Sequence, residues 1–309
     1  MSASSETQDH RSNQVYGGTA HVSVGSYGSS AAGSGDTPEA SGVAPQTGAA
    51  SGRPRRQLLN TAGGRVLVGL IVPVAMLAAW YVTTAAGLFS PVQLPSPASV
   101  WSAADELVHR GELWNHIGIS TQRVLLGFGI GGFLGLAVGS LVGLSRIADA
   151  LFSPTIGAFR AVPSLAWVPL LILWMQIGED SKVTLIAIGA FFPVFTTVYL
   201  ALRHVDRNLI EAARAFGLRG LQLLTTVQLP AVVPSIFSGL RLALAQAWLF
   251  LVAAELIASS MGLGFLLTDS QYNGRTDRLL LAIVLLAVIG KTSDALLGLV
   301  ERWAIRRWA

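Results

Sequence analysis

The chain has 309 residues, of which 52% are hydrophobic and only 12% are charged, and its formal net charge is +4. A soluble domain carries about 25% charged residues, so this composition excludes an ordinary soluble protein and favours a polytopic membrane protein. The chain has no cysteine, which excludes disulfide bonds and thiolate metal sites, and its five histidines show no metal-ligand spacing.

The first 52 residues are rich in Ser, Gly, Ala and Thr and contain few large apolar residues. Such a segment cannot bury enough surface to offset its conformational entropy, so we expect a disordered tail. It contains no apolar stretch typical of a signal peptide. We therefore divide the chain into a tail, residues 1–52, and a membrane domain, residues 53–309.

Six apolar runs are each long enough to cross a hydrocarbon core of roughly 30 Å as a helix of about 20 residues. A backbone in lipid must satisfy its own hydrogen bonds, so the sequence predicts an all-α fold with six transmembrane helices. The expected spans are Val66–Ala86, Ile117–Leu144, Ile156–Ile177, Val183–Leu202, Val232–Ala258 and Leu279–Val300.

Basic residues in the short connecting segments indicate the orientation of these spans. Four of them, Arg110, Lys182, Arg275 and Arg278, fall on one side. Twelve fall on the other side, namely Arg53, Arg55, Arg56, Arg65, Arg146, Arg203, Arg207, Arg214, Arg219, Arg302, Arg306 and Arg307. The positive-inside rule then places both termini, with the tail, in the cytoplasm of a cell-membrane protein.

Two segments are external in this topology, Ser90–Asn115 and Ser259–Arg278. Within the first, the residues Ala98–Val108 are expected to form a short helix that starts at Pro97 or Ser96.

Glycine and proline mark special backbone positions within the spans. Five glycines recur every four residues in the second span, at Gly127, Gly131, Gly135, Gly139 and Gly143. On a helix they form one stripe against which a second helix can pack closely, either as an interface that moves during function or as ordinary packing. Four prolines in the third to fifth spans can kink their helices, namely Pro163, Pro169, Pro193 and Pro234.

Four charged residues fall within or just inside the apolar runs: Arg123, Arg160, Arg241 and Glu255. An intramembrane charge costs about 2.5–3.5 kcal/mol on insertion scales and therefore suggests function. The three arginines lie near span ends, where they can extend their charge to the interface. Glu255 lies deeper, so two roles stay open: a carboxylate that faces the pathway or pairs helices, and a structural partner of a basic residue on another helix.

No motif for catalysis, cofactor binding or a metal site is found in the sequence. The stretch Val288–Ser293 ends in Gly-Lys-Thr-Ser, but the ATP-binding P-loop requires a further glycine at the position of Leu285. Lys291 is three residues from Asp294 and can pair with it on one helix face. The sequence therefore predicts a protein that is not an enzyme and that binds no cofactor or nucleic acid.

A polar segment, residues 203–230, interrupts the apolar runs. Asp206 can cap a helix that begins at Arg207, and Gly217 can end it in the left-handed conformation. Four residues of this helix share one apolar face, Leu209, Ala212, Ala213 and Phe216. A second helical piece, Leu221–Leu229, follows, and Pro230 either ends it or starts the fifth span. The pattern alone leaves open whether the apolar face lies on the membrane or on a protein partner.

The same segment carries a spaced motif, which reads Glu211-Ala212-Ala213, three residues, Gly217, nine residues, and Val227-Gln228-Leu229-Pro230. This pattern resembles the EAA motif of ABC-importer permeases and departs from it only in having Val227 in place of isoleucine. Four further stretches resemble the branch of this family that imports aliphatic sulfonates, taurine or nitrate: Leu94–Trp101, Arg160–Lys182, Gly189–Gly217 and Leu229–Leu267. The resemblance covers roughly residues 60–305 and departs at Met175–Gln176, where the branch often has Phe-Gly.

The resemblance implies the fold of a type I, binding-protein-dependent importer and a homodimer that alternates access for a small anionic solute. It implies two partners besides the second permease copy: an external solute-binding protein and an ATPase subunit dimer on which the coupling segment, 203–230, docks. The residues implied in this coupling are Leu209, Glu211, Ala212, Ala213, Phe216, Gly217, Leu229 and Pro230. The alternative is a self-contained secondary transporter or channel, which would need inverted repeats or an intramembrane ion relay. A membrane-embedded enzyme would need a catalytic motif.

Overall fold

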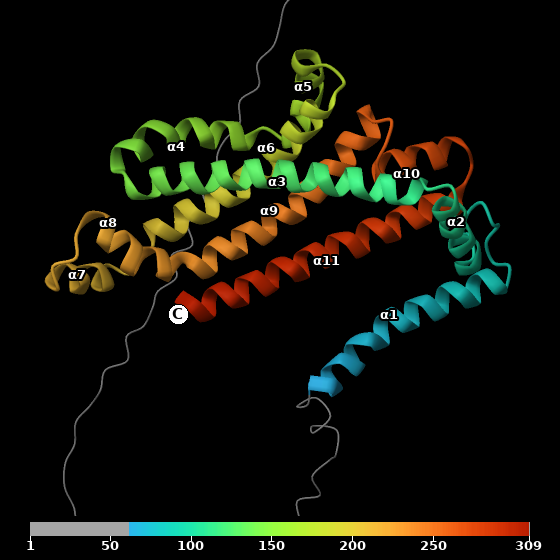
Figure 1. Ribbon diagram of the computed structural model, residues 1–309, viewed down its shortest axis with the longest axis horizontal. Coiled ribbons are helices and arrows are strands. Elements are labelled where there is room, and N and C mark those ends of the chain that lie inside the picture. The colour runs from blue at the N-terminus through green and yellow to red at the C-terminus, as the bar shows by residue number, and fades with distance from the viewer. Residues whose placement is uncertain (1–61, 309) are drawn as a thin grey trace, which may run out of the picture. The chain divides into compact units, whose positions relative to one another are not determined.

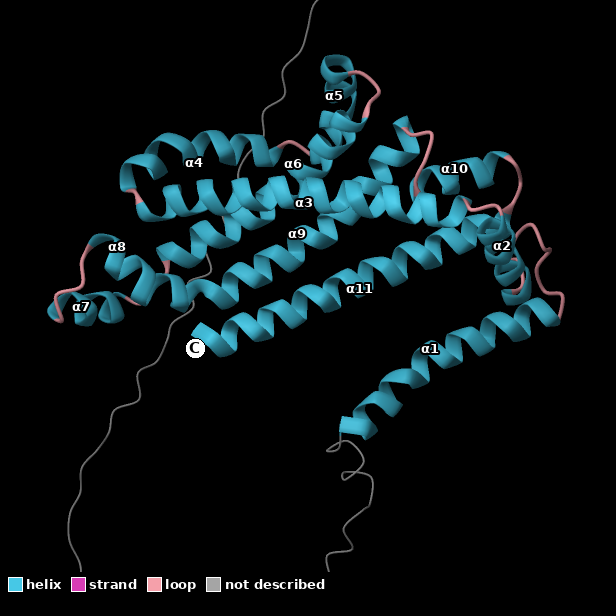
Figure 2. Ribbon diagram, viewed as in Figure 1, coloured by secondary structure: helices cyan, strands magenta, loops and turns pink. Residues whose placement is uncertain are grey.

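The computed structural model describes residues 62–308, with side chains from residue 68 to residue 307 (Figure 1). The expected tail, residues 1–52, lies outside the described residues. Within the described range the chain is helical and contains no strand, which confirms the all-α prediction (Figure 2). The α-helices are α1 (Ala62–Ala85), α2 (Pro97–His109), α3 (Glu112–Leu144), α4 (Arg146–Ala161), α5 (Val168–Met175), α6 (Glu179–Arg203), α7 (Arg207–Ala215), α8 (Gly220–Leu223), α9 (Leu229–Ala258), α10 (Leu263–Tyr272) and α11 (Thr276–Trp308). A 3₁₀ turn, η2 (Ser164–Trp167), and a π-helical turn, η3 (Leu224–Gln228), complete the elements.

Five of the expected spans correspond to helices that are long and apolar enough to cross a membrane: α1, α3, α6, α11 and the continuous segment Gly220–Ala258. The observed helices extend beyond the expected ends by up to a few turns. For example, α3 begins at Glu112 rather than at Ile117, because polar residues that the apolar run excluded are also helical.

The third expected span, Ile156–Ile177, is not one straight helix. The chain instead runs through α4, the turn η2 and α5, and the two halves are bent by 87°. Pro163 explains the break, since it cannot donate a backbone hydrogen bond and it forces the preceding residue out of the helical region. Val162 accordingly is extended, with φ −75° and ψ 125°. The bent pair counts as a sixth span if both halves cross together.

The centre of the bundle is α6, which packs against α3 on one side and α9 on another. Glycines of α3 form the first of these contacts. A Cβ atom placed on Gly135 would lie 2.8 Å from the Cβ of Val194, and one on Gly131 would overlap the carbonyl oxygen of Ala187. The two backbones therefore approach to a distance that side chains on this stripe would prevent. On the α9 side, Gly239 accommodates Thr197 in the same way.

The two segments expected on the external side meet at one end of the bundle, here called the α10 end (Figure 1). The expected short helix is α2, whose first turn is capped by Ser96. Glu106 of α2 accepts hydrogen bonds from Arg275 and Arg278, both at 2.8 Å. These guanidinium groups lower the pKa of Glu106 to about 2, so the carboxylate stays charged and holds α2 against the α10–α11 turn. The opposite end, here called the α7 end, holds α7, α8 and the start of α4 (Figure 1).

The loop between α5 and α6 contains a residue in an unfavourable backbone conformation. Gln176 has φ 63° and ψ −176°, and it is the one non-glycine residue with positive φ in the described part of the chain. This region is adopted almost only by glycine and costs other residues about 1–3 kcal/mol. Gln176 is also where the sequence departs from the Phe-Gly pair often found in the branch that it resembles.

We expect Gly131→Ala to destabilise the bundle by about 1–3 kcal/mol, because the new methyl group must push α3 away from α6. Gly129 lies on the same helix but has open space where a Cβ would stand, so Gly129→Ala is the matched control. That control should be neutral or stabilise by up to about 1 kcal/mol through helix propensity. Thermal unfolding of the detergent-solubilised variants, followed by helical circular dichroism, measures both, and equal midpoints would contradict the proposed contact.

We expect Gln176→Gly to stabilise the protein by about 1 kcal/mol, since the relief of backbone strain exceeds the entropy that glycine adds to the unfolded chain. Gln271 lies within α10, where glycine has no such advantage, so Gln271→Gly should destabilise by about 1 kcal/mol. The same thermal assay compares them. A loss of stability in both variants would show that Gln176 is not strained.

Candidate coupling surface and intramembrane charges

Both ends of the short helix α7 are fixed by its own sequence. At its start, Asp206 caps the helix and its carboxylate accepts a hydrogen bond of 2.9 Å from the backbone N–H of Asn208. At its end, Gly217 has φ 84°, and the backbone N–H groups of Gly217 and Leu218 return to the carbonyls of Arg214 and Ala213. This is the Schellman arrangement, in which a left-handed glycine satisfies the last carbonyls of a helix.

The apolar face of α7 is divided between the surface and the interior. Phe216 is 88% exposed, and Leu209 and Ala212 are also exposed. Ala213 is only 7% exposed and packs against its own chain, which corrects the expectation that it faces a partner. At 100° per residue Ala213 lies toward Ile210, on the side of α7 that rests on the bundle. Glu211 is exposed on the side of α7 away from Leu209.

Beyond α7, the chain does not form a separate second helix before span five. Instead α8, η3 and α9 run on as one helical segment, Gly220–Ala258, which corrects the expected separate piece Leu221–Leu229. Pro230 lies in the first turn of α9, where a proline is tolerated. The backbone N–H of Leu229 bonds to the carbonyl of Leu224, five residues earlier, and this wider turn carries the helix into Pro230. Leu229 and Pro230 are half-buried.

Near the α10 end, Glu255 of α9 has a basic partner on another helix. Glu255 is 1% exposed, and its carboxylate is 2.6 Å from the guanidinium of Arg123 on α3. The remaining carboxylate positions accept hydrogen bonds from Ser120 Oγ at 2.8 Å and from the backbone N–H of Gly264 at 2.8 Å. The sequence left two roles open for Glu255. The contact with Arg123 fits the second of them, a structural partner of a basic residue on another helix.

Arg123 joins two further parts of the chain at this point. Its guanidinium forms two hydrogen bonds of 2.6 Å with Glu179 at the start of α6, and one of 2.7 Å with the carbonyl of Met261. Lys182 Nζ also donates to Glu179, at 2.9 Å. The cluster thus pairs two cations with two carboxylates and fastens α3, α6, α9 and the loop after α9 to one another. Lys182, expected in an external loop, lies within α6 and is buried.

A glycine makes room for the buried carboxylate. Gly262 has φ 122°, and a Cβ there would overlap the carboxylate of Glu255. Its backbone N–H donates to Nδ1 of His116 at 3.0 Å. The loop can therefore close over Glu255 only with glycine at this position.

Arg241 forms a second group of charges with α11, closer to the α7 end. Its guanidinium lies 2.8 Å from Asp294 and 3.4 Å from Glu301, so it pairs across helices rather than extending alone to the interface. The expected pair of Lys291 with Asp294 is present at 3.4 Å. As with Glu255, the sequence analysis singled out Arg241 as a charge within a span but did not identify its partners.

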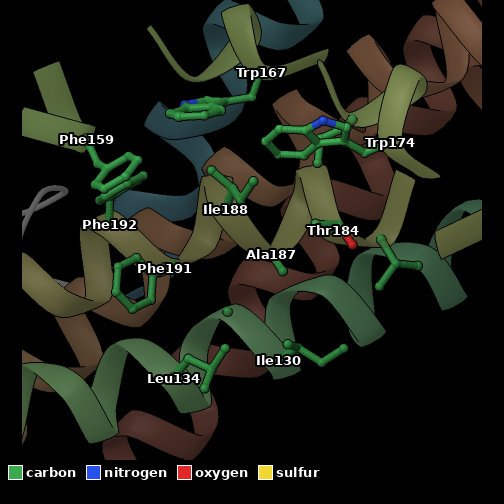
Figure 3. A pocket seen from close by; sticks show the side chains of 13 residues that line it. Ile130, Leu134, Phe159, Trp167, Trp174, Thr184, Ala187, Ile188, Phe191 and Phe192 are labelled. Atoms are coloured by element: carbon green, nitrogen blue, oxygen red, sulfur yellow. The ribbon is translucent and has the colours of Figure 1, made fainter. Parts of the chain in front are cut away.

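An apolar cavity of about 400 Å³ lies between α3, α6 and the bent segment formed by α4 and α5 (Figure 3). Its walls are almost entirely apolar and include five aromatic side chains, with Phe159 and Phe192 close together toward one end and Trp174 toward the other (Figure 3). Thr184 contributes the only hydroxyl group among the lining residues. The sequence analysis did not find this cavity, because its residues come together only through the bend at Pro163.

The chain is similar to known transport proteins over most of its described length. Residues 131–306 match the family model described as the inner membrane component of binding-protein-dependent transport systems. A putative aliphatic sulfonates transport permease of Bacillus subtilis is 39% identical, over 85% of this chain and 95% of that protein. Its counterpart in Escherichia coli is 42% identical, over 76% of this chain and 89% of that protein. The taurine transport system permease of Escherichia coli is 35% identical, over 69% of this chain and 80% of that protein.

Among solved structures, an inward-facing MetNI methionine ABC transporter chain aligns with a TM-score of 0.53 at 20% identity. The alignment covers 64% of this chain and 98% of that chain, and it shows a shared fold. The chain belongs to the family of inner-membrane permeases of binding-protein-dependent ABC transporters, in the branch that contains sulfonate and taurine permeases. It is thus a multi-pass, non-catalytic component of an ABC transporter.

We expect Glu255→Gln to destabilise the protein by about 3 kcal/mol. This lies at the low end of the range for breaking a buried ion pair, because Arg123 keeps its second partner, Glu179. The exposed pair of Asp105 with His109 provides a control, and Asp105→Asn should change stability by less than about 1 kcal/mol. Chemical unfolding in detergent measures both changes. If the two variants were equally stable, the buried pair would not be the clamp described above.

Proposed function

We propose that the chain is the permease subunit of an ABC importer and is moved by a separate ATPase subunit that docks on the segment 203–230. The exposed apolar surface of Leu209, Ala212 and Phe216 carries this proposal. It lies on a helix with charged residues on its other sides, and no other described part of the chain covers it. A large exposed aromatic side chain such as that of Phe216 is typical of the residues that anchor a protein interface.

The EAA motif gives this docking surface its separate support. Ala212 contributes a small side chain that allows close approach of a partner, while Gly217 sets the turn that presents Phe216. The proposed coupling residues also include Glu211, Leu229 and Pro230. Leu229 and Pro230 join the docking surface to α9. ATP-driven closure of two such partners would shift the permease between its two access states through their difference in affinity for those states.

The proposed orientation places the α7 end and both termini in the cytoplasm, and the α10 end outside. Of the basic residues in the connecting segments, the larger number then lies on the cytoplasmic side. The α10 end, with α2 and α10, would receive a solute-binding protein. We further propose a homodimer. The apolar side chains of α1 from residue 68 onward are almost all exposed in the single chain, so a second copy and lipid together would cover them.

The solute class proposed is a small anion, with aliphatic sulfonates, taurine and nitrate as the leading candidates. The support comes from relatives that are named for aliphatic sulfonates and taurine, and from a bicarbonate permease of Synechococcus elongatus that is 29% identical over 78% of this chain. Uptake of labelled ethanesulfonate, taurine, nitrate and bicarbonate, in cells that lack and then regain this chain, tests the class. Restored uptake of none of these anions would overturn it.

We expect Phe216→Ser to lower both co-purification of the ATPase subunit and solute uptake by at least tenfold, because loss of a central interface aromatic often costs 2 kcal/mol or more, about thirtyfold in affinity. The amount of permease in the membrane should not change, since Phe216 has little contact with its own chain.

Tyr272 provides the matched control, because it is an equally exposed aromatic residue at the opposite end of the bundle. Tyr272→Ser should leave ATPase co-purification unchanged. Unimpaired uptake in Phe216→Ser cells, or in cells without the ATPase gene, would contradict the proposed coupling.

A further inference from the structure

Arg160, at the end of α4, differs from the other cations within the spans. The other three within the expected spans, Arg123, Arg241 and Lys291, each have a carboxylate within 4.0 Å. Arg160 has none among the described residues. Its Nη1 donates to the hydroxyl of Thr196 on α6 at 3.1 Å, and the residue is otherwise exposed. A guanidinium has five N–H donors, so most of its hydrogen-bonding capacity is left for a ligand.

This guanidinium lies well inside the α7 end of α4 and α6. The ion pair of Asp149 with Arg203, at 2.8 Å, marks the α7 end of both α4 and α6. Thr196 precedes Arg203 by seven residues, which is about 10 Å along the helix axis. An arginine at such a depth is costly unless it faces the bundle interior, water or a counter-charge. A mobile anion would supply that counter-charge.

Two cavities lie near Arg160. The smaller one, about 170 Å³, is lined by Arg160 and by polar side chains that include Ser153, Thr196 and Tyr199. The larger one is the apolar cavity, toward one end of which lie Phe159 and Phe192 (Figure 3). On α6 the lining residues Thr184, Ile188, Phe192 and Thr196 recur every four residues and so share one face. The cavities therefore lie end to end along this face.

We propose that Arg160 is the intramembrane contact for the acidic group of the transported anion, and that the aromatic cavity beside it accommodates the aliphatic part. Arginine suits the oxygens of a sulfonate or a similar oxyanion because its planar N–H groups bind two of them at once. The cavity volume lies within the roughly 300–1,000 Å³ of small-molecule sites, and its walls offer mainly apolar contact. The group at Arg241 is a weaker candidate, because Asp294 and Glu301 already offset its charge.

This proposal rests on the proposed function, and its test uses the complete transporter in vesicles of phosphatidylcholine alone, supplied with its ATPase subunit and solute-binding protein. Uptake of labelled ethanesulfonate and hexanesulfonate is compared among Arg160→Gln, Arg160→Lys and Arg146→Gln. Arg146 is the matched control, since it is an exposed arginine at the first turn of the same helix. We expect Arg160→Gln to lower uptake of both anions at least tenfold, Arg160→Lys to stay within about threefold of the wild type, and Arg146→Gln to leave uptake unchanged.

The aliphatic half of the site has a separate readout. Ile188→Ser adds a hydroxyl to the wall of the apolar cavity and should lower the ratio of hexanesulfonate to ethanesulfonate uptake at least threefold. Arg160→Gln should lower uptake of the two anions by the same factor and leave their ratio unchanged. An unchanged ratio in Ile188→Ser would overturn this part of the proposal.

The remaining outcomes separate the sources of the anion. If the defect of Arg160→Gln appears only after phosphatidylglycerol is added to the vesicles, the arginine binds the headgroup of an anionic lipid and the proposal is overturned. If Arg160→Gln equals Arg146→Gln while the wild type transports sulfonates, the Arg160 site fails and the proposed function stands. If the wild type transports no anion, both fail.

Discussion

The close approach of α3 to α6 is the contact on which the other features of the bundle depend. Because glycines remove the side chains between these helices, the two backbones approach closely along the second half of α3. At this separation one side chain, that of Arg123 on α3, reaches both Glu179 at the start of α6 and Glu255 on α9. The close packing and the polar cluster thus support each other. The cluster in turn makes the arrangement of the helices more specific. A buried charge that loses its partner is costly, so other arrangements of the helices are disfavoured.

The same contact also determines where the apolar cavity lies. With one face of α6 against α3 and another against α9, the face that remains carries Thr184, Ile188 and Phe192. The chain covers this face only in part, because α4 and α5 diverge at Pro163. A straight third span would have closed over it. The bend is therefore the reason that a hollow with aromatic walls exists beside the most tightly packed pair of helices.

Much of this arrangement can be predicted from single residues. Apolar run length identified α1, α3, α6, α9 and α11, since the thickness of a bilayer sets a length that composition alone reveals. Asp206 and Gly217 gave the ends of α7, because capping depends on local backbone chemistry. Pro163 indicated a kink in the third span, but a break of 87° into two helices was not predicted, because the length of an apolar run does not show in which direction the chain continues. Partner choice was also beyond the sequence. Glu179 and Asp294 meet their arginines through the rotation of each helix about its axis, which tertiary packing sets.

The segment Gly220–Ala258 has a mechanical consequence, since it is one helical segment of 39 residues. Its length of about 58 Å makes it a lever that begins beside the turn at Gly217 and ends beside Glu255. A tilt of about 5° about its α7 end would move its far end by about 5 Å, which is one helical turn. The ion pair with Arg123 lies near that far end, where the arm is longest. If a protein partner docks beside Gly217 as proposed, a small rotation there would move the helices most at the ion pair of Glu255 with Arg123.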